Sequence, residues 1–234
     1  MIVKLTKTLF FYFLKYTKLS RLQWHDLRDV KPVSRSFGIE RGKPIDRFYI
    51  EKFLSANKHL IKGKVLEVGE TRYIKQFGAG VESADVLHVE KRMNATLVAD
   101  LTKLDTLPHN KFDCFIATQV LNFIFDFQKA IEGSYHLLRP GGVMLATVAC
   151  ISRISPYDVV RWGHFWGFYP QGIERAFKNV FGEANVTVQV YGNSLSAICF
   201  IKGIAVDELK VEELDYLDAD YPVSISVIAR KPSL

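Results

Sequence analysis

Short apolar runs rich in β-branched residues recur at intervals along the chain. They stand at 64–68, 84–89, 96–99, 112–117 and 142–149, and two runs with alternating polar positions, "NVTVQVYG" and "PVSISVIARK", lie near the carboxyl end. Runs of this length and composition are typical of β-strands. Between most of them the apolar positions recur every three or four residues, which predicts helices.

The predicted helices are marked by their ends. Pro44 suits the first position of a helix that continues towards Gly63. A long helix is predicted at about 120–138, and the "RPGG" at 139–142 ends it. Another is predicted at about 171–181. Strands that alternate with helices predict an α/β fold with a mostly parallel seven-stranded sheet and helices on both faces. The last two strands predict an antiparallel pair at one edge.

Residues 1–31 differ in charge from the rest of the chain. They hold seven Lys or Arg and two Asp or Glu, whereas the remaining residues hold 24 and 23, so the net charge of +6 is concentrated at the amino end. A basic footprint over the whole surface is therefore absent, and nucleic acid is not an expected partner. We expect two regions, an amino-terminal helix region at 1–31 and one globular domain at 32–234.

The amino-terminal region predicts a basic amphipathic helix. On a helix, four lysines form one stripe: Lys4, Lys7, Lys15 and Lys18. The opposite face carries Ile2, Leu5, Leu9, Tyr12, Phe13, Tyr16 and Leu19. The apolar run at 9–14 is too short to span a bilayer, and no signal-peptide cleavage pattern follows it. The pattern favours a cytoplasmic protein that lies at the inner face of an anionic membrane, or a terminal helix that packs on its own domain or a second copy.

The cysteines and histidines indicate neither a disulfide framework nor a metal site. Cys114, Cys150 and Cys199 are scattered in apolar segments, which favours reduced thiols. No CxxC or HxxxH spacing occurs, so no metal ligands are predicted.

The stretch "GKVLEVGETRYIKQFGAG" at 63–80 begins like a cofactor-binding turn. An apolar strand ends at Gly69, where a tight turn and close backbone approach are needed. Side-chain-bearing residues follow instead of further glycines, and a GxGxxG loop is absent. That absence argues against a nicotinamide dehydrogenase.

Five segments, in this order, resemble the motifs of the Rossmann-like class I methyltransferases that use S-adenosylmethionine. They are "KVLEVG", "ATLVADLTKL", "KFDCFIATQVLNFI", "AIEGSYHLLRPGGVMLATV" and "FWGFYPQGIERAF". The resemblance covers about residues 44–231 and implies that fold, that cofactor and methyl transfer. Three further segments, "RGKPIDRFYIEKFL", "RWGHFWGF" and "YGNSLSA", resemble a bacterial subgroup associated with glycosyltransferases and polysaccharide biosynthesis.

The resemblance implies a set of cofactor-binding residues. They are Glu67, Gly69, Glu70, Arg72, His88, Glu90, Asp100, Leu101, Thr118 and Gln119. Glu67 is expected to receive the methionine ammonium through the backbone or a water. Glu90 is expected to accept both ribose hydroxyls, with His88 in its place if the strand register differs. Asp100 is expected at the adenine amino group, although an Asp there also suits a helix cap.

The glycine-poor first motif leaves two outcomes open. Arg72 carries a positive charge that either pairs with the cofactor carboxylate or blocks the cleft. A functional cofactor pocket is the first expectation, and a degenerate pocket that binds no cofactor is the alternative.

Methyl transfer requires an acceptor held near the methyl group and the removal of a proton. The segment 151–169 follows a predicted strand, so it is expected at the carboxyl ends of the strands, where such folds place their sites. His164 is the first candidate for the general base because its unperturbed pKa lies near neutral. Asp158 is the second candidate. A packing role for His164 is the alternative.

The candidate substrate-binding residues lie in two segments. Arg161, Trp162 and Trp166 follow the fifth predicted strand, where indole faces suit sugar rings, and packing is the alternative role. The second group precedes the first strand and consists of Arg41, Arg47 and Tyr49, where arginines suit a phosphate or carboxylate.

The leading hypothesis is therefore O-methylation of a glycan or a lipid-linked saccharide, with a glycosyltransferase as a further partner. N-methylation of an amino sugar or small amine is one alternative. A non-catalytic scaffold bound to a glycosyltransferase is another. The fourth predicted strand ends in "ATQV" rather than an Asn-Pro-Pro-Tyr signature, which argues against amide or nucleobase N-methylation.

Overall fold

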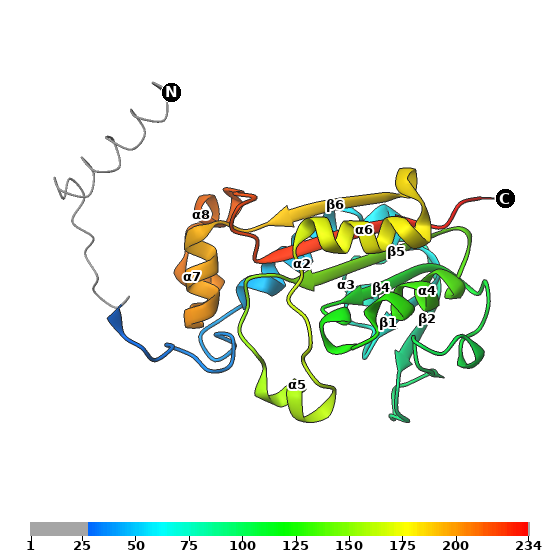
Figure 1. Ribbon diagram of the computed structural model, residues 1–234, viewed down its shortest axis with the longest axis horizontal. Helices are drawn as coiled ribbons and strands as arrows, with labels where there is room; N and C mark the ends of the chain where they lie inside the picture. The colour runs from blue at the N-terminus through cyan, green and yellow to red at the C-terminus, as the bar shows by residue number, and fades with distance from the viewer. Residues whose placement is uncertain (1–27, 234) are drawn as a thin grey trace, which may run out of the picture. The chain divides into compact units, whose positions relative to one another are not determined.

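The computed structural model describes residues 28–233, so the predicted amphipathic helix lies outside the described residues. A single seven-stranded sheet organises the domain, in the order β3-β2-β1-β4-β5-β7-β6 (Figure 1). The strands are β1 (Gly63–Val68), β2 (Val81–His88), β3 (Leu97–Val98), β4 (Phe112–Thr118), β5 (Leu138–Ala149), β6 (Val186–Tyr191) and β7 (Ser224–Arg230).

The strand directions confirm the predicted mostly parallel sheet. Strand β1 is parallel to both β2 and β4, and β3 and β5 extend this parallel array on either side. Strand β7 is antiparallel to β5 and to β6, so the two last strands form the antiparallel pair at one edge. The parallel array brings the carboxyl ends of β1, β2 and β4 to one rim of the sheet.

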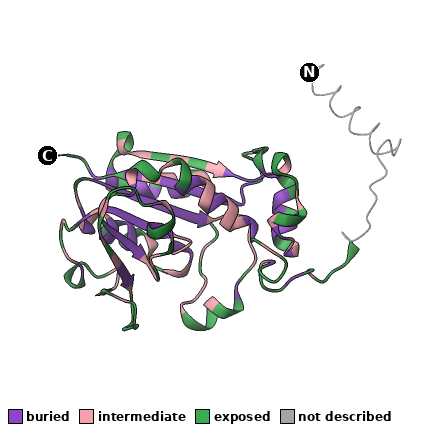
Figure 2. Cartoon of the chain, turned by 180° about the vertical axis from the view of Figure 1, so that it is seen from behind, coloured by how far each residue is buried: buried purple, intermediate pink, exposed green. Residues whose placement is uncertain are grey.

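Helices cover both faces of the sheet. The α-helices are α2 (Ile45–Ala56), α3 (Arg72–Phe77), α4 (Phe127–Leu137), α5 (Pro156–Arg161), α6 (Pro170–Phe181), α7 (Ser194–Lys202) and α8 (Val211–Asp215). Short 3-10 turns stand at η2 (Lys58–Leu60), η3 (Leu104–Thr106), η4 (Leu121–Phe123), η5 (Glu183–Asn185) and η6 (Val206–Glu208). Figure 2 shows the central strands buried and the outward sides of the helices exposed.

The two faces of the sheet form separate cores because side chains alternate along each strand. Leu66 and Phe115 pack with α4 and α6 on one face. Val65 and Ile116, their neighbours in sequence, pack with α2, α3 and α7 on the other. The three cysteines are free thiols; Cys114 and Cys199 are buried and Cys150 is partly exposed.

The helix predicted at about 120–138 begins later than expected. The chain forms the short turn η4 first, and α4 starts at Phe127. The side chain of Asn122, which is 1% exposed, explains the interruption. Its amide donates to the Trp166 carbonyl at 2.7 Å, and its oxygen accepts from the Ala149 amide at 3.2 Å. These bonds hold the chain against β5 and the segment that follows it.

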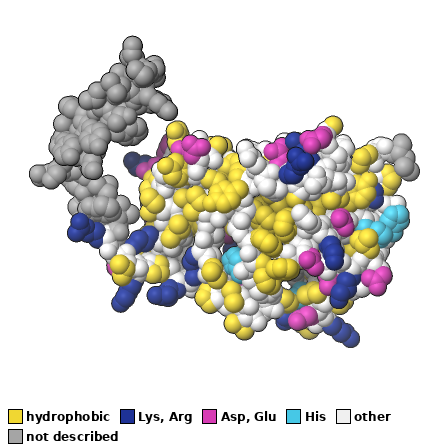
Figure 3. Space-filling model, viewed as in Figure 1, with side chains coloured by type: hydrophobic (Ala, Val, Ile, Leu, Met, Phe, Trp, Pro, Cys, Tyr) yellow, Lys and Arg dark blue, Asp and Glu magenta, His cyan; other side chains and the backbone are white. Residues whose placement is uncertain are grey.

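Two glycines have left-handed backbones beside strands. Gly80 precedes β2 with a φ of 81°. Gly141, with a φ of 80°, was expected to end the helix before a strand at 142–149, but α4 ends at Leu137 and Gly141 lies within β5. Both values lie in the left-handed region, which glycine adopts without steric penalty. In the space-filling view, apolar side chains form a broad area on one face, and acidic and basic side chains are interspersed around it (Figure 3). Within residues 28–233, no helix combines the length and apolar character needed to cross a bilayer.

Candidate functional site

The carboxyl ends of the central strands open into a cavity of about 600 Å³, which we call the main cleft. Its lining comes from the ends of β1, β2 and β4, from the loop after β3 and from segments near α4 and α5: Val68, Gly69, Leu87, His88, Val89, Glu90, Ala99, Asp100, Leu101, Thr102, Gln119, Val120, Phe123, Ile124, Phe125, Asp126, Arg161, Trp162 and Phe165. Cavities of this size at this rim are where open α/β folds bind their ligands.

Gly69 gives the main cleft a bare stretch of backbone. Its φ is 84°, and a Cβ built there would meet no atom within 4 Å. The turn is fixed from both sides, since the Gly69 amide donates to the Leu87 carbonyl at 3.0 Å and its carbonyl accepts from Asn94 at 2.8 Å. A side chain at this position would therefore enter the space where a ligand is expected to approach the backbone.

The end of β2 contributes two of the expected residues. Strand β2 ends at His88, and Glu90 follows two residues later on the exposed rim. The Glu90 amide donates to His88 Nδ1 at 3.0 Å, and its carboxylate pairs with Arg92 at 3.2 Å. The His88 ring contacts Trp162 edge-on at 5.4 Å between centroids. Both residues line the main cleft, so either can meet a hydroxylated ligand there.

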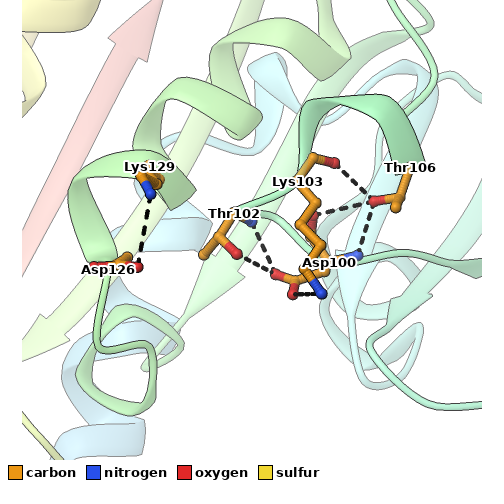
Figure 4. Close-up of polar contacts among 6 residues, drawn as sticks. All are labelled: Asp100, Thr102, Lys103, Thr106, Asp126 and Lys129. Carbon is orange, nitrogen blue, oxygen red and sulfur yellow. Dashed lines mark hydrogen bonds and ion pairs between the residues drawn. The ribbon is translucent and has the colours of Figure 1, made fainter.

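Asp100 lines the main cleft and also caps the turn that follows it. Its carboxylate accepts from the Thr102 amide at 2.9 Å and the Thr102 hydroxyl at 2.8 Å, and Lys103 lies 3.4 Å away (Figure 4). Burial alone would raise the pKa of Asp100, but these hydrogen bonds and the Lys103 charge outweigh it and lower the pKa. Figure 4 also shows Asp126, just before α4, paired with Lys129 in the first turn of α4.

Glu67 lies on the other side of β1. It is 3% exposed, and its carboxylate accepts from the amides of Tyr73 at 3.1 Å and Ile74 at 2.9 Å. It thus stabilises the first turn of α3 and is not among the residues that line the main cleft. Burial raises the pKa of Glu67 to about 7, against the opposing effect of these two amides.

The structure brings six of the ten expected cofactor residues to the main cleft. They are Gly69, His88, Glu90, Asp100, Leu101 and Gln119. The four that do not line it are Glu67, Glu70, Arg72 and Thr118. Arg72 and Glu70 are exposed and lie 3.9 Å apart, so Arg72 does not block the cleft.

A smaller cavity of about 180 Å³ adjoins the main cleft, and we call it the side cavity. It is lined by Phe37, Asp46, Gln119, Asn122, Phe123, Ala149, Ser152, Ser155, Asp158, His164 and Phe200. Gln119 and Phe123 line both spaces, so they form the wall between them.

Gln119 has unusual geometry at this wall. Its φ of 55° is left-handed, a conformation uncommon for a residue other than glycine. Its backbone amide donates to the Thr147 carbonyl at 2.8 Å, which holds the turn after β4. Its side-chain nitrogen is buried and has no hydrogen-bond partner among residues 28–233. A buried donor left unpaired is unfavourable, so the site favours an incoming acceptor atom.

The two predicted candidates for proton transfer meet in the side cavity. His164 Nδ1 accepts from the Ser155 amide at 3.4 Å, and the ring contacts Phe123 edge-on at 5.0 Å. Burial lowers the pKa of His164, and the Asp158 charge opposes that effect. The imidazole is therefore neutral at pH 7, as a proton acceptor must be.

The aromatic segment after β5 divides between the main cleft and packing. Arg161 and Trp162 line the cleft. The Trp166 indole instead donates to the carbonyls of Ile124 and Phe125, both at 3.1 Å, and its ring contacts Phe127. Trp166 thus has the packing arrangement that was the alternative for this segment.

The three candidates before β1 lie outside both cavities. Arg41 pairs with Glu208 at the surface. Tyr49 is fully buried and donates to the Leu214 carbonyl at 3.2 Å. Arg47 is half-buried and does not line either space, whereas its neighbour Asp46 lines the side cavity.

The sequence interpretation missed Asp46, Asn122 and the aromatic residues Phe37 and Phe200 as parts of the site. An asparagine inside a predicted helix was the available signal for Asn122, because Asn favours caps and turns. Between residues 28 and 233, no group of three His, Cys, Asp or Glu side chains is arranged to hold a metal ion.

Comparison with known proteins identifies the central segment. Residues 71–146 match a family model described as "Methyltransferase domain". This segment runs from the start of α3 into β5 and includes the end of β2 and the turn at Gln119. No curated protein matches the chain.

Several solved structures share the fold. A possible histamine N-methyltransferase from Thermotoga maritima superposes with a TM-score of 0.52 at 15% identity, covering 80% of this chain and 91% of that chain. A 1,6-didemethyltoxoflavin-N1-methyltransferase from Burkholderia thailandensis gives a TM-score of 0.51 at 13% identity, covering 90% and 84%. The cyclase SpnF gives a TM-score of 0.52 at 16% identity, covering 83% and 85%.

At these identities the structural likeness shows the fold alone, and one neighbour with this fold is a cyclase. The match to the methyltransferase-domain model indicates an activity, which the fold alone does not. Together they support a methyltransferase domain, matched over residues 71–146, with a Rossmann-like fold.

Proposed function

We propose that this protein transfers the methyl group of S-adenosylmethionine to a hydroxyl of a saccharide, whose reacting atom lies at the wall formed by Gln119 and Phe123. The observation that carries the proposal is the junction of the two cavities at these residues. A cofactor in the main cleft and an acceptor in the side cavity would meet there. Because the two spaces meet at these residues, the acceptor atom and the methyl group would be close enough for a displacement reaction.

The main cleft has the features that the cofactor needs. Gly69 leaves room for close approach, and Asp100 and Glu90 offer carboxylate oxygens to amino and hydroxyl groups. Leu87, Ala99 and Leu101 give the cleft an apolar wall. When bound, S-adenosylmethionine supplies an electrophilic methyl group on a sulfonium ion.

The acceptor atom supplies the electron pair in the reaction. With S-adenosylmethionine held in the main cleft, the acceptor oxygen would form the new bond to the methyl carbon, and sulfur would keep the electron pair of the carbon–sulfur bond that breaks. The acceptor proton must then leave. We assign this proton to His164, with Asp158 as the second candidate, because both line the side cavity. His164 accepts it at Nδ1 in place of the long Ser155 contact, or at Nε2 after a change of tautomer.

N-methylation of an amino sugar or small amine is the second candidate function. Asp46 and Asp158 both line the side cavity, and the described lining contains no Lys or Arg. An acidic lining favours a basic acceptor. In this case the nitrogen lone pair attacks the methyl carbon, and His164 again receives the proton.

Calorimetry with S-adenosylhomocysteine tests the cofactor site, and a screen of saccharides for transfer of labelled methyl groups tests the acceptor. We expect binding in the first experiment and labelled sugar in the second. Absence of binding to the full chain would favour the non-catalytic scaffold. Labelling of amines alone would favour the second candidate function.

We further propose that residues 1–22 hold the protein at an anionic membrane surface. The support is the sequence pattern of four lysines opposite seven apolar residues. Flotation with anionic vesicles tests it, and substitution of Lys4, Lys7, Lys15 and Lys18 by Gln should abolish the binding that high salt weakens. Equal flotation of both proteins would leave packing as the role of this segment.

A further inference from the structure

We infer that the side cavity binds a protonated amine of the acceptor, so that the substrate class is an amino sugar or another small amine-bearing polyol. This inference rests on the proposed methyl transfer and identifies the group that the acceptor must carry. It does not decide which atom is methylated, because the amine can serve for recognition while a neighbouring hydroxyl reacts.

The charges of the side cavity are one-sided. Asp46, in the first turn of α2, and Asp158, in α5, come from distant parts of the chain and line the same space. No Lys or Arg belongs to the described lining. The Asp46 carboxylate accepts one described hydrogen bond, which comes from the Arg47 backbone amide at 2.8 Å. Burial raises the pKa of Asp46, and the nearby Arg47 charge only partly opposes this. A cation inside the cavity would stabilise the carboxylate form.

Aromatic rings supply the rest of a cation-binding lining. Phe37, Phe123 and Phe200 line the side cavity, and the rings of Phe37 and Phe200 lie 5.6 Å apart between centroids. Aromatic faces attract ammonium groups, most strongly where water is excluded. Rings beside carboxylates suit an ammonium group better than a neutral hydroxyl.

The Phe37 ring already shows this behaviour. The Arg153 guanidinium lies 4.1 Å from its centroid and donates to the Arg35 carbonyl. Arg153 does not line the side cavity. It stacks on the Phe37 ring and forms no described ion pair with Asp46 or Asp158.

One unpaired polar atom of the lining indicates where a hydroxyl of the acceptor lies. The Gln119 side-chain nitrogen is buried without a hydrogen-bond partner among the described residues, and Gln119 lines the side cavity. The Thr147 hydroxyl and the Arg153 Nε atom are also buried without such a partner, but neither residue lines the side cavity. A hydroxyl of a polyol would accept from Gln119 while the amine meets the carboxylates.

The volume limits what enters. At about 180 Å³ the side cavity is about a third of the main cleft in size. It therefore suits the amine-bearing edge of one sugar ring. The remainder of a larger acceptor extends past Gln119 towards the cleft.

The test compares D-glucosamine with D-glucose, which differ in one amino group. Binding of each sugar to the full chain loaded with S-adenosylhomocysteine is followed by ligand-observed NMR titration. We expect glucosamine to bind at least about tenfold more tightly, the effect of one charge-assisted hydrogen bond. Asp46→Asn should remove most of this preference, and so should Asp158→Asn, which guards against a folding defect in either variant alone.

The matched control is Glu51→Gln, which removes a negative charge from the same helix. Glu51 pairs with Lys43 and lines neither cavity, so the preference should persist. Equal affinity for the two sugars, no binding of either, or preference retained in both Asp variants would overturn the inference. The affinity for S-adenosylhomocysteine is measured on the same samples and separates this failure from failure of the proposed function. If the unmodified chain does not bind S-adenosylhomocysteine, the proposed cofactor site is wrong.

Discussion

The main cleft and the side cavity are built from different kinds of sequence. The main cleft lies at the ends of adjacent parallel strands, so hydrogen-bonded ladders fix its parts relative to one another. The side cavity has no such ladder of its own. Phe37, Asp46, Asp158, His164 and Phe200 reach it from loops and helices that are far apart in the chain.

This difference explains why six predicted cofactor residues line the cleft, whereas only Gln119, Asp158 and His164 of the side cavity were predicted from the sequence. A strand end is a local property, and its neighbours follow from the order of strands in the fold. The cavity depends on how α2, α5 and α7 pack against the sheet, which no local pattern encodes. It also suggests a division of labour, with cofactor binding on the rigid rim and acceptor selection in the assembled cavity.

The largest expected effect comes from substituting His164, which should change turnover without changing cofactor binding in the main cleft. His164→Ala should lower turnover by about 10²–10⁴-fold, the usual contribution of a general base. Affinity for S-adenosylhomocysteine should hardly change, because His164 lines only the side cavity. Single-turnover rates and calorimetry measure the two quantities. His59→Ala, at an exposed position, is the control. Full turnover in the His164→Ala variant would show that His164 is not the general base, and Asp158 would become the candidate.

Asn122 is the residue on which the side cavity most depends. Its side chain links η4 to the end of β5 and to the Trp166 carbonyl. Asn122→Ala leaves the Ala149 amide and the Trp166 carbonyl without these partners, which should lower the free energy of unfolding by roughly 2–4 kcal/mol. Urea denaturation measures this loss.

The control is Asn185→Ala, which removes a single 2.8 Å bond from an Asn side chain to the Phe181 carbonyl. It should destabilise by about 1 kcal/mol. If both variants lose the same amount, Asn122 is not a special link. Acceptor binding should suffer more than cofactor binding in Asn122→Ala, and the reverse result would contradict the separation of the two regions.

Gly69 tests the cleft without touching the side cavity. Gly69→Val places a branched side chain in open space and forces it to a φ of 84°, so affinity for S-adenosylhomocysteine should fall at least about tenfold. Gly80→Val is the matched control, since Gly80 has a φ of 81° but does not line the cleft. Equal loss of affinity in the two variants would attribute the effect to backbone strain alone.

Much of the fold follows from the sequence because hydrophobic period and glycine turns are local. The order of the strands and the antiparallel edge pair agree with the structure, although β5 already begins at Leu138 and includes Gly141. The start of α4 does not, because Asn122 bonds to residues more than twenty positions away. Propensity cannot anticipate a contact of that range.

The two carboxylates Glu67 and Asp100 show the same limit within the candidate site. Both were predicted for the cofactor, yet only Asp100 lines the main cleft. Glu67 shares the alternation of Val65, which packs under α2 and α3, so its side chain lies on that face of β1. The alternation of side chains along β1 was enough to predict the face on which Glu67 lies, whereas the "KVLEVG" motif suggested a contact with the cofactor.

The smallest expected effect concerns pH and follows from the position of Glu67. Burial raises its pKa to about 7 in the folded protein, whereas an unfolded Glu titrates near about 4.3. The folded state therefore holds a proton that the unfolded state has lost between these values. The stabilisation is complete below the unfolded pKa and disappears as the pH rises through about 7.

Glu67→Gln removes this titration while its amide oxygen can still accept from Tyr73 and Ile74. The variant should gain roughly 1–2 kcal/mol relative to the unmodified protein between pH 5 and pH 8, measured by urea denaturation at both values. Glu70→Gln, at the exposed neighbour, should show no such gain. Parallel pH curves for Glu67→Gln and the unmodified protein would mean that Glu67 is ionised throughout. The two amides at the start of α3, and not burial, would then determine its charge.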